Sequence, residues 1–323
     1  MRHAGKSVIL FACLGASSFQ YAHGAYPERP IRVVVPYVPG GNIDITARTI
    51  APGMSAELGQ QVVIDNRGGA NGSVGQALVS NAPADGYTLV LTSISALVTT
   101  PALSGQFDYD AMKHFSPITM VTRVPIIMVV RLGLPARNVK EFITLAKSQP
   151  EKFIMASGGT GSAGHLTGVL FQTLTGTKLT HVSYKGAGQA HLDVLSGQVD
   201  VYFDQLSSAM SLIRAERLRV LAVLTRSRSA EIPDVPTMEE AGVAGCESGI
   251  TSGLLAPART PAAIVGKLRD AIVKVLRTTS VRESFARLGA EAVESTPQEF
   301  TQFLRTDTER WTKVIQLTGV KPN

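Results

Sequence analysis

The feature that most constrains the fold is an order of elements that occurs twice. Residues 31–93 and 152–204 each alternate short apolar runs with amphipathic stretches, in the order strand, helix, strand, helix, strand. Equivalent positions are widely separated: Pro36 lies 121 residues before Ser157, and Val63 lies 119 residues before Val182. Strands that alternate with helices predict parallel sheets covered by helices. The chain is therefore expected to form two α/β lobes that face each other across a cleft.

In each copy a glycine-rich turn joins the first strand to the first helix. The first turn holds Pro39, Gly40 and Gly41, and the second spans residues 158–164. Ligands of parallel sheets bind beyond the carboxyl ends of the strands, where helix N-termini offer free N–H groups to an anion. A plain tight turn uses the same residues. Because the turn recurs in the second lobe, we favour an anion-binding cleft.

Local signals also set expectations for single helices. Asn42 is a suitable N-cap for the first helix, with Asp44 in its first turn, and Pro52-Gly53 is expected to kink or end that helix early. The C-terminal part is expected to hold two helices that pack back on the first lobe, opened by Thr260-Pro261 and by Thr296-Pro297. The chain would then cross between the lobes twice, near residues 121–131 and 245–252, as a hinge requires.

The N-terminus indicates export. Residues 1–24 carry Arg2 and Lys6, a short apolar stretch and small residues before a cleavage point, as a secretory signal does. The stretch is too short to span a bilayer, and a lipoprotein site at Cys13 is a weaker alternative. Removal of this segment lowers the net charge from +6 to +4 and leaves Cys246 without a disulfide partner. Scattered cations do not suggest a nucleic-acid partner.

Patterns for catalysis are weak. Residues 159–164 match the dinucleotide fingerprint G-x-G-x-x-G, but the next strand ends "THVSYKG" and lacks the acidic residue that binds a ribose. No serine-hydrolase elbow, nucleophile–base pair, acid–base carboxylate pair or metal-ligand spacing is evident. We therefore expect a binding protein rather than an enzyme, with no cofactor and no metal.

Polar residues at the predicted cleft have both binding and structural interpretations. His165 begins a helix beside the second turn, Lys185 follows a strand, and Asp204 ends one, where it would bind a ligand ammonium, cap a helix or hold the hinge. Short hydroxyls at strand ends suit a small polar ligand, and equally suit loop formation. They are Thr92, Ser93, Ser95, Ser157 and Ser162.

Several longer motifs together resemble one family. They include "YPERPIRVVVPYVPGGNIDITAR", "APADGYTLVLTS", "ASGGTGSAGHLTGVLF" and "IPDVPTMEEAGV". In this order they are similar to the Bug family, the TctC-like periplasmic solute-binding proteins of tripartite tricarboxylate transporters, over nearly the whole mature chain. The chain departs from the family at Pro52-Gly53 and at Thr251-Ser252, where members often carry a bulky aromatic residue. The second departure leaves the identity of the ligand open.

The resemblance implies a type II periplasmic-binding-protein fold. Residues 25–125 with 247–323 would form lobe 1 and residues 126–246 lobe 2. A small carboxylate would be held between them by backbone and water contacts, and a monomer would deliver it to a membrane permease. A ligand-sensing protein and, less favoured, an exported enzyme are the alternatives. The expected ligand-binding residues are Tyr37, Val38, Gly40, Gly41, Asp44, Thr92, Ser93, Ser157, Gly161, Ser162, His165, Lys185 and Asp204.

Overall fold

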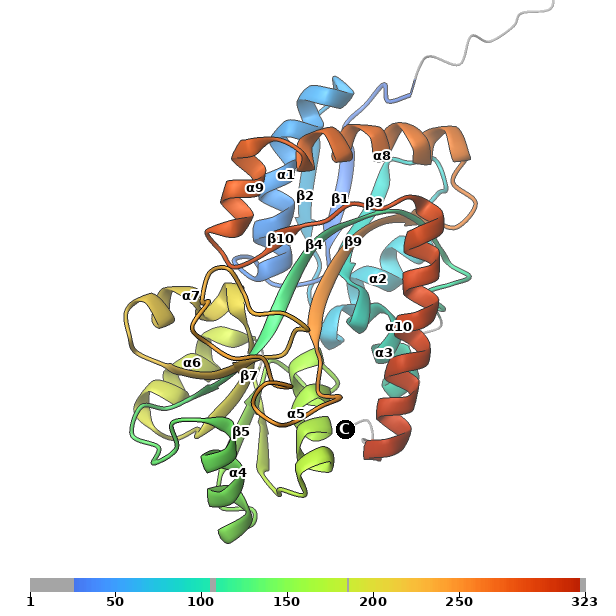
Figure 1. Ribbon diagram of the computed structural model, residues 1–323. Coiled ribbons are helices and arrows are strands. Elements are labelled where there is room, and N and C mark those ends of the chain that lie inside the picture. Colours follow the sequence, from blue (N-terminus) through green and yellow to red (C-terminus); the bar gives the residue numbers. More distant parts are fainter. Residues whose placement is uncertain (1–25, 105–108, 185, 320–323) are drawn as a thin grey trace, which may run out of the picture.

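A computed structural model describes residues 26–104, 109–184 and 186–319. Two α/β lobes lie one above the other in Figure 1 and share a ten-stranded sheet. The predicted signal segment, residues 1–24, and the candidate residue Lys185 lie outside the described part of the chain. Within that part, no helix combines the length and the apolar character needed to cross a membrane.

The first lobe is built from the elements at the two ends of the chain. Its N-terminal elements are β1 (Ile31–Val35), α1 (Asn42–Leu58), β2 (Val62–Asn66), the short 3-10 helix η1 (Ala70–Gly72), α2 (Ser73–Ser80), β3 (Thr88–Ser93) and α3 (Ile94–Ser104). Its C-terminal elements are α8 (Ala262–Leu276), α9 (Thr279–Ala286), β10 (Glu291–Ala292) and α10 (Pro297–Thr318). Strand β1 pairs in parallel with β2 and with β3, as the repeated pattern predicts.

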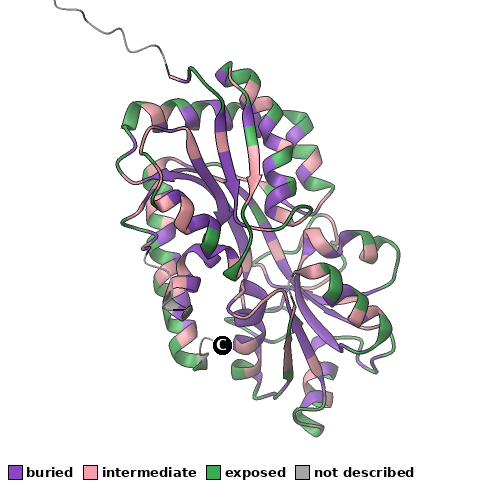
Figure 2. Cartoon of the chain, turned by 180° about the vertical axis from the view of Figure 1, so that it is seen from behind, coloured by how far each residue is buried: buried purple, intermediate pink, exposed green. Residues whose placement is uncertain are grey.

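The second lobe repeats the arrangement in the middle of the chain. It contains α4 (Val139–Ser148), β5 (Ile154–Ser157), α5 (Ala163–Thr175), β6 (Thr180–Ser183), α6 (Ala187–Ser196), β7 (Val201–Gln205), α7 (Leu206–Arg214) and β8 (Arg219–Val223). Strand β5 pairs in parallel with β6 and with β7. Buried residues follow the strands, while the helices expose their outer faces (Figure 2).

Two long strands join the lobes. Strand β4 (Phe115–Val130) pairs antiparallel with β9 (Gly249–Pro257) along its first part and with β7 along its second part. The sheet therefore runs in the order β2-β1-β3-β9-β4-β7-β5-β6. This is the two-crossing connection of a type II binding-protein fold. The residue boundaries given above for each lobe stay a prediction.

Helix α1 contradicts one local expectation. It continues through Pro52 to Leu58, so the predicted early end is wrong. Gly53 allows α1 to pack closely against α8, because a Cβ at this position would lie 2.8 Å from the Val275 side chain. The buried face of α1, which includes the fully buried Met54, also packs on the sheet. This packing outweighs the hydrogen bond that the proline removes.

The C-terminal helices do more than cover the first lobe. Helix α9 and the short strand β10 lie between the two predicted helices and were not anticipated. Helix α10 runs along α3 and continues to α5 of the second lobe (Figure 1), where Trp311 is buried in the apolar cluster of that lobe. The C-terminal helices thus pack on the first lobe as expected, through α8 on α1 and α10 on α3, and α10 extends further to the second lobe.

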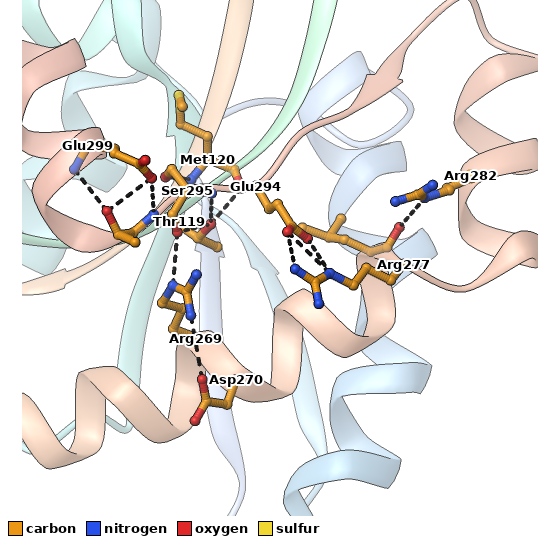
Figure 3. A network of polar contacts seen from close by, with 11 residues as sticks. Thr119, Met120, Arg269, Asp270, Arg277, Arg282, Glu294, Ser295 and Glu299 are labelled. Atoms are coloured by element: carbon orange, nitrogen blue, oxygen red, sulfur yellow. Dashed lines mark hydrogen bonds and ion pairs between the residues drawn. The ribbon is translucent and has the colours of Figure 1, made fainter.

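The start of α10 is fixed to the sheet by a polar network (Figure 3). Thr119 of β4 donates to the Ser295 carbonyl at 3.0 Å and accepts from the Ser295 N–H at 2.9 Å. Arg269 of α8 donates to the same carbonyl at 2.9 Å. Thr296 and Glu299 form a capping box, and Gly319 ends the helix in the left-handed conformation.

Candidate functional site

Four helices begin where strands β1, β3, β5 and β7 end, at the boundary between the lobes. The connecting segments are residues 37–44, 92–99, 157–165 and 204–208, which lead into α1, α3, α5 and α7. These segments contain no lysine or arginine. An anion bound here would therefore be met mainly by the N–H groups and positive dipole ends of the helices. The predicted residues Tyr37 to Asp44, Thr92, Ser93, Ser157 to His165 and Asp204 all lie in these segments.

The first segment is held by the Asp44 carboxylate. Asp44 accepts from the Gly40 N–H at 2.8 Å, from Arg48 Nε at 2.9 Å and from Asn66 Nδ2 at 2.9 Å. Burial would raise the pKa of Asp44, but the hydrogen bonds from Arg48, Gly40 and Asn66 together lower it. A carboxylate with this many donors is engaged in supporting the loop. Asn66 also donates to the Tyr37 carbonyl at 3.1 Å, which joins β2 to the same loop.

The tip of this loop is open. Val38 is 61% exposed, and Gly40 has φ +82° with open space where a side chain would be. Gly41 is the N-cap of α1, so the expectation that Asn42 caps the helix is wrong: Asn42 is the first helical residue. Its side-chain nitrogen is buried and has no partner among the described residues.

Behind the loop, a buried polar chain connects Tyr37 to α2. The Tyr37 hydroxyl lies 3.5 Å from Thr92 Oγ1, and Gln76 Nε2 donates to the same oxygen at 2.7 Å. Tyr109 donates to Gln76 Oε1 in turn. Burial raises the pKa of Tyr37, which keeps its hydroxyl protonated. Sequence analysis missed Gln76 and Tyr109, because neither belongs to a strand end or a glycine-rich turn.

The second lobe supports its glycine-rich loop with two stacked imidazoles. His165 and His181 lie 4.0 Å apart between ring centroids, and the Gly161 N–H donates to His165 Nδ1 at 3.0 Å. Ser162 caps α5 and accepts from the His165 N–H at 3.3 Å. His181 of β6 is thus part of this loop support.

Ser157 and His181 form a hydroxyl–imidazole pair that the sequence did not reveal. Ser157 Oγ lies 2.7 Å from His181 Nε2 and donates its proton to the Gly159 carbonyl at 3.1 Å. The Gly159 N–H also donates to Ser157 Oγ at 3.3 Å, so the hydroxyl is bonded within its own loop. The Ser157 side chain is also fully buried. These contacts and the burial favour a loop-supporting role for the pair, and the expectation of a protein without catalytic groups stays a prediction.

Asp204 is engaged in a similar way at the start of α7. It lies 2.6 Å from His191 Nε2 and accepts at 2.7 Å from both the Gln205 N–H and the Ser208 hydroxyl. The side chain is 1% exposed. Gln205 is the N-cap of α7 and no side-chain capping bond is formed there, so Asp204 supports the turn that leads into the helix and does not cap it. Groups of three or more side chains able to hold a metal ion are absent from the described residues.

The two lobes touch on both sides of this boundary. Thr99 of α3 donates to the Gly161 carbonyl at 3.4 Å, and Leu103 lies against the same glycine. On the other side, Leu206 of α7 packs against Gly289, and one apolar cluster contains both Ile43 of α1 and Leu206. The two lobes are therefore linked at this boundary by contacts of α3 with the loop 157–165 and of α7 with Gly289.

The imidazole stack leads to a pH prediction. Burial, with a smaller contribution from His181, lowers the pKa of His165 from 6.5 to about 4. The unfolded chain therefore takes up a proton between pH 6.5 and 4 that the folded chain does not, and stability falls as pH falls through that range. We expect His165 to lower the free energy of unfolding by about 2 kcal/mol at pH 5 relative to pH 7.5.

Denaturant unfolding at the two pH values, in the wild type and in His165→Gln, measures this contribution. The glutamine side chain retains an acceptor for Gly161 but does not titrate. The wild type should lose more stability on acidification than the variant. Equal losses in the two proteins would show that His165 is not the group responsible.

Comparison with known proteins extends over most of the chain. Residues 46–320 match the family model described as "Tripartite tricarboxylate transporter family receptor". Protein BugT of Bordetella pertussis is 36% identical over 297 residues, which cover 92% of this chain and 91% of BugT.

Two solved structures share the fold closely. R. palustris Rpa4515 with adipate has a TM-score of 0.87 and 33% identity, over 93% of this chain and all of that one. MatC of Rhodopseudomonas palustris with bound malate has a TM-score of 0.83 and 31% identity, over 90% of this chain and all of that one.

Proposed function

Because the chain belongs to the tripartite tricarboxylate transporter receptor family, we propose that it is exported to the periplasm and captures one small carboxylate between its lobes. The observation that carries the proposal is that four strand-to-helix segments at the lobe boundary present helix N-termini and contain no lysine or arginine. Such a site selects an anion by N–H groups rather than by ion pairs. Adipate and malate in the two related structures belong to the same ligand class.

The proposed mechanism is capture without catalysis. The ligand enters between the lobes, its carboxylate binds at the loops 37–44 and 157–165, and the lobes close around the two strands β4 and β9. The closed form then docks on the membrane subunits of the transporter. The contacts of Asp44, Asp204 and Ser157 favour a supporting role for these side chains, so the ligand-binding groups we propose are mainly backbone N–H groups.

Thermal unfolding against a panel of acids tests this function. A ligand that binds the folded state alone stabilises it by about 2.7 kcal/mol at a hundredfold excess over Kd. We expect an increase in Tm of several degrees for one class among C4 dicarboxylates, citrate, acidic amino acids and aromatic acids. Sugars serve as uncharged controls. A shift with a sugar or a dinucleotide, and with no acid, would refute the proposal.

A further inference from the structure

Three buried polar atoms near the helix N-termini lack a hydrogen-bond partner among the described residues. They are Asn42 Nδ2 at the start of α1, and Gln205 Oε1 and Ser207 Oγ on either side of the first residue of α7. Buried polar atoms are usually paired, and an unpaired one costs about 1–3 kcal/mol. Orphan atoms at a proposed binding site are explained most simply if a ligand supplies the missing partners.

We infer that the ligand is a hydroxy acid, whose carboxylate binds near Asn42 and Ser207 and whose hydroxyl pairs with Gln205. This inference rests on the proposed function, since it names the class of acid that the same site selects. The atoms differ in what they require. Asn42 Nδ2 is a donor and Ser207 can donate, so both suit a carboxylate, whereas Gln205 Oε1 is an acceptor that a carboxylate cannot satisfy.

The position of Gln205 supports its contact with a ligand between the lobes. It ends β7 directly before α7, and it pairs in register with Ile126 of the connecting strand β4. Side chains alternate along a strand, so Gln205 lies on the same face as Phe203, which packs on Phe171 of α5. The Gln205 side chain therefore lies on the face of the sheet that α5 covers. Helix α5 begins at the glycine-rich loop of the proposed site.

A hydroxyl suits this site better than an ammonium group. The segments 37–44, 92–99, 157–165 and 204–208 contain two acidic residues, Asp44 and Asp204. Asp44 is already engaged by Gly40, Arg48 and Asn66, and Asp204 by His191, Gln205 and Ser208. A desolvated ammonium would find no unengaged carboxylate to balance its charge. A hydroxyl is neutral, and it can donate to the Gln205 oxygen that has no partner among the described residues.

Calorimetric titration with matched acids tests the inference. One series is malate, succinate and aspartate, another is mandelate, phenylacetate and phenylglycine, and a pair is citrate and tricarballylate. Within each set the carbon skeleton is kept, while a hydroxyl is replaced by hydrogen or, in the two series, also by an amino group. In the set that binds, we expect the hydroxy acid to bind about tenfold or more tightly than the other members.

Two variants test whether Gln205 is responsible for the preference for the hydroxy acid. Gln205→Met keeps the length of the side chain and removes its polar atoms, so the ratio between the hydroxy acid and its deoxy analogue should fall below about threefold. Ser207→Ala should weaken both acids to the same extent and leave the ratio unchanged. Melting temperatures confirm that both variants are folded.

The failures of the two proposals are distinguishable. Equal binding of the hydroxy and deoxy acids by the wild type, or a ratio that survives Gln205→Met, would overturn the hydroxy-acid inference and leave carboxylate capture intact. Binding of the amino acid as tightly as the hydroxy acid would also overturn it. If the wild type binds no acid at all, the proposed function fails, and this inference fails with it.

Discussion

Asp44→Ala is expected to weaken binding of the carboxylate ligand by about tenfold to a hundredfold while the protein stays folded. Asp44 orients the Gly40 N–H and, through Arg48 and Asn66, fixes the loop that leads into α1. Hydrogen bonds to a charged group contribute about 1.5–3 kcal/mol each, and the freed loop would have to be ordered again on binding. Calorimetric titration of the variant with the best acid measures the loss.

Asp44→Asn is the matched control, because it removes the charge but retains an oxygen that can accept from Gly40. Loss of a negative charge near the ligand would by itself strengthen binding of an anion. If loop support is the role of Asp44, the asparagine variant should bind within about threefold of the wild type, while the alanine variant does not. Tighter binding by both variants would show that repulsion by Asp44 matters more than its support of the loop.

Gly164→Ala is expected to lower the free energy of unfolding by about 2–4 kcal/mol, one of the largest effects of a single methyl group in this chain. A Cβ at position 164 would lie 2.3 Å from the carbonyl oxygen of Phe203. A backbone atom cannot rotate away as a side chain can, so α5 would have to move off β7. Denaturant unfolding monitored by circular dichroism measures the change.

Gly266→Ala provides the control within a helix. Position 266 lies in α8 and has no atom within 4 Å of the added Cβ. Alanine is the better helix former by about 1 kcal/mol, so this variant should be neutral or slightly more stable than the wild type. If the two variants were equally stable, the close approach of α5 to β7 would not be what requires glycine at 164.

The repeated strand–helix order was predictable because its signals are local. Short apolar runs, glycine-rich turns and the capping box at Thr296 and Glu299 are all set by neighbouring residues, and the structure contains each of them. Local signals gave a wrong prediction where packing between elements determines the length of a helix. Pro52 suggested the end of a helix, but the contacts of α1 with the sheet and α8 carry the helix past it.

Helix α3 shows the limit of periodicity. Residues 94–104 are mostly apolar and include many that favour strands. No amphipathic pattern therefore indicates a helix here. The helix packs on α10, α2 and β9, and is therefore apolar on more than one side. Thr99 of this helix contacts Gly161 across the lobe boundary. The sequence could not predict this contact, because the two residues belong to distant elements.

The place of the proposed site stays a prediction, but the structure shows what its polar side chains contact. Strand ends and helix starts are visible in the sequence, so the four segments could be selected. The partners of Asp44, Ser157 and Asp204 come from other elements, namely Asn66, His181 and His191. Contacts between residues distant in sequence decide whether a polar side chain meets a ligand or supports a loop, and a single sequence does not contain them.

Calorimetric titration of the mature protein with an acid and with its uncharged amide tests the central claim most directly. Succinate and succinamide, or the equivalent pair for the acid that gives the largest thermal shift, have the same shape and differ in charge. A site built from helix N-termini should bind one molecule of the acid per chain and bind the amide at least about a hundredfold more weakly. Equal affinity for the acid and the amide would contradict the account, because it would show that the cleft does not select a carboxylate.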